Sequence, residues 1–185
     1  ECELIVPSGA ESGLKMNRGF TLPADGSVAL TVDFDLRKSL HAPPGQRSMM
    51  EMCTQGYLLR PTLRLVQDSE VGAIAGTVDP LLYTNVAGCV PMVYVFPDGA
   101  NAAGSTTPDD QDTIEPNPLV MAKPDSDTGA YKATFLPQGN YTVAYTCSAD
   151  DQNADDSATF VFGEKKPAEV KANLITQVNF VAPLS

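Results

Sequence analysis

The sequence has no tryptophan, only one histidine and no long run of apolar residues. A membrane-spanning helix needs roughly 20 consecutive apolar residues, so we expect no transmembrane segment. Base-assisted nucleophilic catalysis needs a group that titrates near neutral pH, and the one histidine, His41, opens the loop HAPPGQRS. The chain also carries neither a phosphate-binding glycine loop nor a dinucleotide-binding motif. These absences favour a protein that is not an enzyme, and no cofactor is expected.

Basic side chains are scarce, with 12 Lys and Arg against 23 Asp and Glu and a net charge of −11. Residues 1–70 carry seven basic and nine acidic residues, a net −2, whereas residues 71–185 carry five and fourteen, a net −9. An acidic surface repels phosphate backbones and anionic lipid headgroups. Nucleic acid is therefore not expected as a partner, and an anionic membrane surface is disfavoured.

The four cysteines form no CxxC pair, and with one histidine they do not suggest a zinc site. An even, widely spaced set predicts two disulfides in an exported protein, the alternative being four buried thiols in the cytosol. Cys89 begins a predicted strand and Cys147 ends another, while Cys2 opens a strand and Cys53 precedes one. We therefore predict the pairs Cys89–Cys147 and Cys2–Cys53.

Short segments of alternating apolar and polar residues, separated by turn signals, predict an all-β fold of the β-sandwich type. The segment GAYKATFLPQGNYTVAYT (129–146) predicts a β-hairpin that turns at residues 137–140. The segment MMEMCTQ (49–55) is ambiguous and fits one helical turn. The other predicted strands cover residues 2–7, 13–23, 28–40, 57–66, 71–80, 89–99, 158–163 and 168–183.

The polar segment QDSE (67–70) predicts a boundary between two β-sandwich-type domains, residues 1–68 and 71–185. The first domain has about four strands, too few to close a sandwich, so it is expected to be incomplete at its N-terminus. Its predicted strands present one apolar face, formed by Leu4, Val32, Phe34, Leu36, Leu63 and Leu65. Pro61 cannot donate a backbone hydrogen bond and predicts an edge or a bulge.

Charged residues occupy the other face of the same strands. Asp33 and Asp35 alternate with the apolar positions of one strand, and Arg60 and Arg64 share a face of the next. Carboxylate pairs can serve acid–base catalysis, but cross-strand ion pairs with these arginines are the favoured interpretation.

The second half resembles the carboxypeptidase-regulatory-like, or transthyretin-like, domain. The residues that carry the resemblance are IAGTV (74–78), VYVFPDG (93–99), DTGAYKATFLPQGNYTVAYT (127–146) and VNF (178–180). The resemblance implies a β-sandwich fold and no particular activity. It also implies that the hairpin places four residues around the core: Tyr131, Phe135, Leu136 and Tyr141.

The first half resembles an uncharacterised family of Gram-negative surface lipoproteins. The matching segments are VPSGAESGLK (6–15), DFDLRKSL (33–40), GYLLRPTLRLV (56–66) and VGAIAGTV (71–78). The resemblance implies an exported protein at the outer-membrane surface, in the periplasm or secreted. It also implies further strands upstream, so residues 1–68 would be the later strands of a sandwich and Cys2 would not be a lipidated cysteine.

These features favour a non-enzymatic cell-surface or extracellular protein with a structural, adhesive or assembly role. Its first segment would contact another copy or a retained upstream fragment through the apolar face. The alternative is a ligand-binding module for glycan or Ca²⁺. Without tryptophan, and with most tyrosines and phenylalanines at buried strand positions, an aromatic platform for glycan is disfavoured.

Two acidic loops are the candidate Ca²⁺ ligands, because Ca²⁺ takes six to eight oxygen ligands. Neither loop matches the EF-hand spacing or has its invariant glycine, so solvated acidic loops are the favoured interpretation. The carboxylates are Asp109, Asp110, Asp112 and Glu115 in the first loop and Asp150, Asp151, Asp155 and Asp156 in the second.

Calcium binding can be tested by thermal melting, because a ligand that binds only the folded chain raises the melting temperature. We expect no change on adding millimolar Ca²⁺ or a chelator. A rise with Ca²⁺ that the chelator reverses would identify a site, and the loop containing Asp109, Asp110, Asp112 and Glu115 would be the first to examine by substitution.

Overall fold

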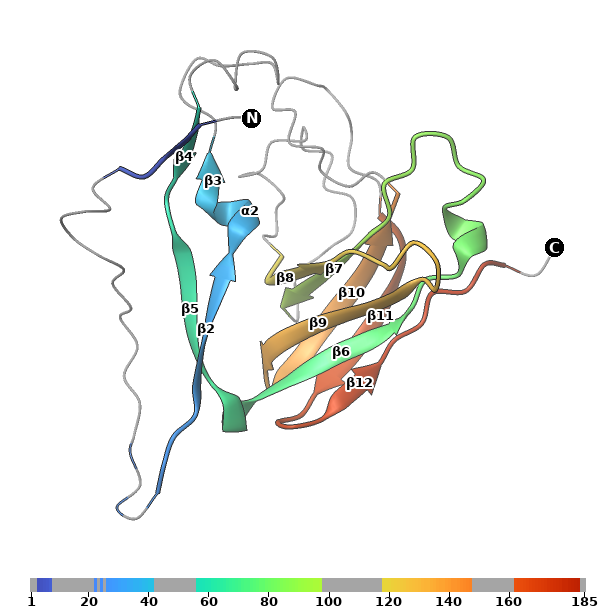
Figure 1. Ribbon diagram of the computed structural model, residues 1–185. Coiled ribbons are helices and arrows are strands. Elements are labelled where there is room, and N and C mark those ends of the chain that lie inside the picture. The colour runs from blue at the N-terminus through green and yellow to red at the C-terminus, as the bar shows by residue number, and fades with distance from the viewer. Residues whose placement is uncertain are drawn as a thin grey trace.

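The structure, a computed structural model, describes residues 3–7, 22, 24, 26–41, 56–97, 118–147 and 162–183. These residues form strands joined by turns and short helical turns, which confirms the all-β prediction (Figure 1). The helical turns are α2 (Leu36–Ser39), η1 (Asp68–Glu70) and η2 (Pro80–Leu82). The strands are β1 (Leu4–Ile5), β2 (Leu30–Asp35), β3 (Leu40–His41), β4 (Tyr57–Leu59), β5 (Thr62–Gln67), β6 (Val71–Thr77), β7 (Met92–Pro97), β8 (Val120–Ala122), β9 (Ala130–Pro137), β10 (Gly139–Thr146), β11 (Phe162–Val170) and β12 (Ile175–Gln177).

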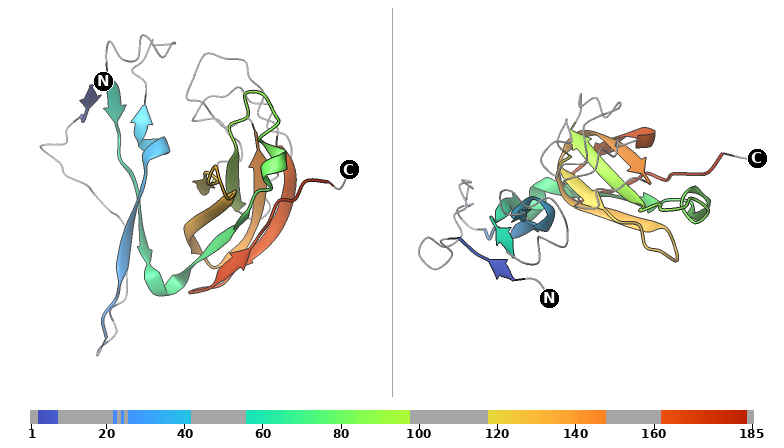
Figure 2. Two further views of the ribbon diagram at one scale, coloured as in Figure 1. Left: turned by 45° about the vertical axis from the view of Figure 1, so that its right-hand side comes forward. Right: turned by 90° about the horizontal axis from the view of Figure 1, so that it is seen from above.

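Strands β6 to β12 form a β-sandwich (Figures 1 and 2). One sheet has the strand order β11-β10-β7-β8 and the other the order β12-β6-β9. Alternate side chains of each strand meet between the sheets. The best-buried of them are fully inaccessible to solvent: Ile74, Val93, Val95, Leu136 and Val143. Burying one such side chain contributes about 1.5–3 kcal/mol, so this shared core holds the two sheets together.

A second apolar cluster covers the outer face of the four-stranded sheet. Tyr94 and Phe96 alternate with the core valines of β7 and are also fully buried. Phe162 stands edge-on to both rings, with its centroid 5.6 Å from that of Tyr94 and 5.5 Å from that of Phe96. Strand β7 is therefore buried on both faces, which explains why its sequence, MVYVFP, is almost entirely apolar.

The predicted hairpin over residues 129–146 is wrong. Strand β9 pairs with β6, and β10 pairs with β7 and β11, so the two consecutive strands belong to different sheets. The chain turns a corner between the sheets instead of folding back on itself. Alternation identified both strands correctly, but it is a property of each strand alone and does not identify the partner.

Three features shape this corner. Phe135 adopts a positive φ of 58° and is half-buried, so the resemblance wrongly placed it in the core beside Tyr131, Leu136 and Tyr141. Gly139 has a φ of 155°, a conformation that favours glycine. The Tyr141 hydroxyl donates a hydrogen bond to the Pro137 carbonyl at 2.7 Å. A tyrosine that bonds its hydroxyl to the backbone a few residues upstream is a known corner device of β-sandwiches.

The first segment forms two small sheets apart from the sandwich core. Strands β2 and β5 pair as a two-stranded antiparallel ribbon, and β1, β4 and β3 form a short sheet at its end (Figure 1). The predicted strand 28–40 ends at Asp35, and the next four residues form α2. Arg60 and Pro61 separate β4 from β5, as Pro61 predicted. The predicted boundary at residues 67–70 coincides with η1, which links β5 to β6.

Most of the predicted strand 13–23 and all of the segment 49–55 lie outside the described residues. Among the residues that the structure describes, no helix is long and apolar enough to cross a membrane.

The corner hydrogen bond can be removed by Tyr141→Phe, which keeps the ring in the core. We expect the free energy of unfolding at neutral pH to fall by about 0.5–1.5 kcal/mol. Burial raises the pKa of Tyr141 in the folded protein above its ordinary value of 10.0. The protonated hydroxyl therefore contributes its full stability below pH 10.0, and this contribution is lost as the pH rises through the raised pKa of the folded protein. The difference between the two proteins should therefore narrow in alkaline solution.

Urea unfolding followed by circular dichroism at several pH values measures both effects. Asn140→Ala, an exposed position in the same corner, is the control and should change little. Equal unfolding free energies for the wild type and Tyr141→Phe would show that strand pairing alone holds the corner.

Candidate functional site

The ribbon of β2 and β5 separates apolar from charged side chains. Directly opposed residues of an antiparallel pair lie on the same face, and Val32 lies opposite Leu65 and Phe34 opposite Leu63. Together with Leu30, these four residues form what we call the apolar ribbon face. The opposite face carries Thr31, Asp33, Asp35, Thr62, Arg64 and Val66.

The charged face confirms one predicted pair. Asp33 lies opposite Arg64, and the Arg64 guanidinium forms an ion pair with the Asp33 carboxylate through Nε and Nη2. Asp35 lies opposite Thr62, and Arg60 lies between β4 and β5. The strand register therefore does not place Arg60 opposite Asp35. A carboxylate paired in this way is a structural contact of the ribbon.

The charged face is also the one turned toward the sandwich. Val66 on that face is only 3% exposed. Burial raises the pKa of the Tyr141 hydroxyl, and the nearby charge of Arg64 partly offsets that rise. The Thr31 hydroxyl donates to Asp68 in η1 at 2.7 Å, which ties the base of the ribbon to the linking turn. The apolar ribbon face is not wholly turned away from the sandwich, because Phe34 lines a groove whose other wall is formed by residues 118–121.

Two residues of the apolar ribbon face are exposed to solvent. Val32 is 47% exposed and Phe34 is 36% exposed, although both belong to a regular strand pair. Leu30, Leu63 and Leu65 are half-buried. Of the aromatic side chains in the described ranges, Phe34 alone falls in the exposed class. Exposed apolar side chains that are contiguous across two strands are typical of a contact surface.

The end of the ribbon is closed by the buried hydroxyl of Ser39. This hydroxyl donates to the Asp35 carbonyl and accepts a hydrogen bond from the Thr62 amide at 2.8 Å. The Ser39 carbonyl also accepts a hydrogen bond from the Arg60 amide at 2.7 Å. These bonds end β2 at Asp35, so Leu36 leaves the strand face that alternation predicted and is 63% exposed on α2. His41, expected in a loop, ends β3 opposite Leu58.

A groove of about 370 Å³ separates the ribbon from the edge of the sandwich. Residues 33–36 form its ribbon wall and residues 118–121 its sandwich wall. Leu36, Leu119, Val120 and Met121 make it largely apolar. The groove continues the exposed apolar surface from the end of β2 toward β8.

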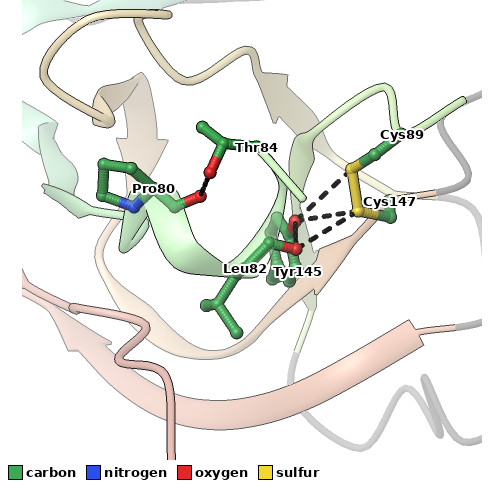
Figure 3. The surroundings of a disulfide bond; sticks show 6 residues. All are labelled: Pro80, Leu82, Thr84, Cys89, Tyr145 and Cys147. Atoms are coloured by element: carbon green, nitrogen blue, oxygen red, sulfur yellow. Dashed lines mark hydrogen bonds between the residues drawn. A yellow bond between two sulfur atoms is a disulfide. The ribbon is translucent and has the colours of Figure 1, made fainter. Parts of the chain in front are cut away.

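The opposite end of the sandwich carries the disulfide between Cys89 and Cys147, which confirms the predicted pair (Figure 3). Their Cα atoms lie 4.7 Å apart. The Tyr145 hydroxyl lies 3.2 Å from Cys147 Sγ and donates to the Leu82 carbonyl at 3.3 Å. Burial, with a smaller contribution from Tyr83, raises the pKa of Tyr145. The disulfide and this hydroxyl together tie the segment that contains η2 to the end of β10.

A second groove, of about 440 Å³, lies beside the disulfide. Leu82, Tyr145, Phe180, Val181 and Pro183 line most of it. Lys166 stands at 5.6 Å from the Phe180 ring centroid and pairs with Glu164 at 3.2 Å. Of the polar groups that line the groove, Glu164 therefore pairs with a lysine outside the lining, and the Tyr145 hydroxyl bonds to the Leu82 carbonyl.

The predicted metal ligands and the second disulfide lie outside the described residues. This applies to Asp109, Asp110, Asp112, Glu115, Asp150, Asp151, Asp155, Asp156, Cys2 and Cys53. Calcium binding and the pair Cys2–Cys53 therefore stay predictions. In the described part of the chain, no group of three or more His, Cys, Asp or Glu side chains is arranged to hold a metal ion.

The comparison with protein families concerns the first segment. Residues 2–61 match the model of a domain of unknown function, DUF4382. The matched range holds β1 to β4, including the exposed strand β2, and ends just before β5. No curated protein matches the chain. The predicted resemblance of the first half to an uncharacterised domain is confirmed in this form, while its lipoprotein character and the transthyretin-like character of the second half stay predictions.

Alternation in the sequence predicted the apolar ribbon face, but it does not indicate which face of the ribbon buries Val66. Tyr145 was also not predicted as the partner of the disulfide. The spacing of Tyr145 and Cys147 was an available signal, because residues two apart in a strand lie on the same face.

Removing the disulfide tests how firmly it holds the segment 79–90. A double Cys89→Ser, Cys147→Ser variant should lose about 2–4 kcal/mol of unfolding free energy, since the bond restricts the unfolded chain. Chemical unfolding under non-reducing conditions measures the loss. Val86→Ala, an exposed change in the same segment, is the control. A double variant as stable as the control would mean that the Tyr145 hydrogen bond alone holds the segment.

Proposed function

We propose that this chain is a non-catalytic cell-surface or extracellular β-protein with a structural or adhesive role in assembly, and that the ribbon is its contact surface. The apolar ribbon face carries the proposal. A two-stranded ribbon is marginally stable alone, and one with an open apolar face gains stability when another surface covers that face. The ribbon joins the sandwich through η1, where the Thr31 hydroxyl donates a hydrogen bond to Asp68.

The ion pairs of the described residues support a structural role. Asp33–Arg64 joins opposed positions of two strands, Glu164–Lys166 lies within β11, and Glu169–Lys171 lies at the end of β11. Such pairs neutralise each other on the sheet surface. A catalytic arrangement would instead direct acid, base and nucleophile toward one cleft.

The location outside the cytoplasm rests on the disulfide. Disulfides persist in oxidising compartments, and Cys89–Cys147 is formed in the structure. The resemblance of the first segment to Gram-negative surface lipoproteins supports the outer-membrane surface, the periplasm or secretion as its location. The match of residues 2–61 to a domain of unknown function is compatible with this proposal and names no activity.

A neutral apolar dye such as Nile red tests whether the apolar ribbon face is a contact surface. We expect dilute, folded wild-type chain to enhance the dye fluorescence and Phe34→Asp to lose most of that enhancement. Leu81→Asp is the matched control, because Leu81 is 65% exposed on the sandwich, far from β2 in sequence, and it should keep the signal. A neutral dye is needed because the chain carries a net charge of −11.

A folded wild-type chain that enhances the dye no more than Phe34→Asp, and that sediments as a monomer at every concentration, would overturn the proposal. Circular dichroism of each variant establishes that the comparison is made between folded proteins.

A further inference from the structure

The disulfide between Cys89 and Cys147 has a hydrogen-bond donor closer to one of its sulfur atoms than to the other (Figure 3). The Tyr145 hydroxyl lies 3.2 Å from Cys147 Sγ and 3.8 Å from Cys89 Sγ. The sulfur atoms of a disulfide carry no hydrogen, so the hydroxyl is the donor in either contact. Its position therefore favours negative charge on Cys147 over negative charge on Cys89.

The Tyr145 hydroxyl keeps its proton under conditions in which thiols react. Burial, with a smaller contribution from Tyr83, raises the pKa of Tyr145 above its ordinary value of 10.0. A free thiol reacts as the thiolate and has an ordinary pKa of about 8.5. The hydroxyl is therefore still protonated where external thiolates are abundant. It can turn from the Leu82 carbonyl, 3.3 Å away, to a thiolate that forms at Cys147.

The Cys89 side of the bond leaves more room for an incoming group. Both cysteines are half-buried, but Cys89 directly follows an exposed segment, residues 84–88. A side-chain atom added at Gly88 would meet no atom of the described residues within 4 Å other than its chain neighbours. Cys147 instead follows Thr146, which is only 1% exposed. An external thiolate therefore approaches Cys89 more readily than Cys147.

We infer that the Cys89–Cys147 bond is a site of thiol–disulfide exchange, at which an external thiolate attacks Cys89 and Cys147 is the leaving group. A new bond joins the external sulfur to Cys89 Sγ while the bond between the two cysteines breaks. The electron pair of the broken bond leaves on Cys147 Sγ, and the Tyr145 hydroxyl donates a hydrogen bond to this thiolate. A better-stabilised thiolate leaves faster. One disulfide replaces another, so the step needs no oxidant.

The fold keeps the two cysteines in position for the bond to close again. The Val90 amide donates a hydrogen bond to the Cys147 carbonyl at 2.9 Å, and this contact does not depend on the sulfur atoms. The Cys147 thiolate formed by exchange thus stays beside Cys89 and can displace the external thiol by the reverse step. The inference goes beyond the proposed structural role, because it adds a reversible attachment site for a thiol.

Timed exchange of the folded whole chain with reduced glutathione near neutral pH tests the inference. Acid stops the reaction, and the free thiols are alkylated before digestion. Cleavage after Lys and Arg separates the two cysteines, because Lys123 and Lys132 lie between them, so mass spectrometry measures glutathione on each. At early times we expect roughly fivefold more glutathione on Cys89 than on Cys147, since a hydrogen bond to a charged group favours one leaving thiolate.

Tyr145→Phe keeps the buried ring and removes the donor. We expect exchange at Cys89 to slow by roughly fivefold and the preference for Cys89 to shrink, because the leaving thiolate loses its hydrogen bond. Tyr83→Phe is the matched control, because the buried Tyr83 hydroxyl lies in the same segment and has no hydrogen-bond partner among the described residues. This variant should exchange like the wild type.

A purely structural role of the Tyr145 hydroxyl predicts the opposite change in rate. Loss of its bond to the Leu82 carbonyl would loosen the segment and speed exchange at both sulfur atoms. Faster exchange in Tyr145→Phe therefore overturns the inference. A wild-type chain that takes up no glutathione at Cys89, or as much at Cys147, overturns it as well. Circular dichroism establishes that each variant is folded.

Discussion

The hydrogen bond from the Tyr141 hydroxyl to the Pro137 carbonyl lies where three parts of the molecule meet. It closes the corner at which the chain leaves one sheet of the sandwich and enters the other. Tyr141 itself sits between Pro97 of β7 and Ala168 of β11, and Pro137 lies opposite Val71, the first residue after the linking turn. Burial raises the pKa of this hydroxyl, and the charge of Arg64 in the ribbon partly offsets the rise. A change at this corner would therefore affect both sheets of the sandwich.

The ribbon shows how an ordinary strand pattern can leave apolar side chains exposed. Its alternation of apolar and charged residues is that of a sheet with one buried face. In this chain the charged face lies toward the sandwich, where Asp33 and Arg64 neutralise each other. The apolar face is left outside, with Val32 and Phe34 exposed. Solvating these side chains is unfavourable, and that free energy is available to whatever surface covers them.

The two ends of the sandwich differ in how their connections are held. Near the ribbon, hydrogen bonds of Thr31, Ser39 and Tyr141 define the geometry. At the other end a disulfide does so, supported by the Tyr145 hydroxyl (Figure 3). A covalent tie remains when local contacts open, whereas single hydrogen bonds exchange with water. The connection at the disulfide end is therefore covalent, whereas the connections near the ribbon depend on hydrogen bonds.

Much of this molecule was determined by sequence alone. Alternation predicted the all-β class, β2, β5 and the strands on either side of the corner, and cysteine placement predicted Cys89–Cys147. These features depend on local periodicity and on strand ends, which the sequence displays directly. Strand pairing does not depend on local periodicity. Only the tertiary structure therefore decided that β9 and β10 belong to different sheets. The side of the ribbon on which Val66 is buried was decided in the same way, because local periodicity does not determine where the ribbon lies relative to the rest of the molecule.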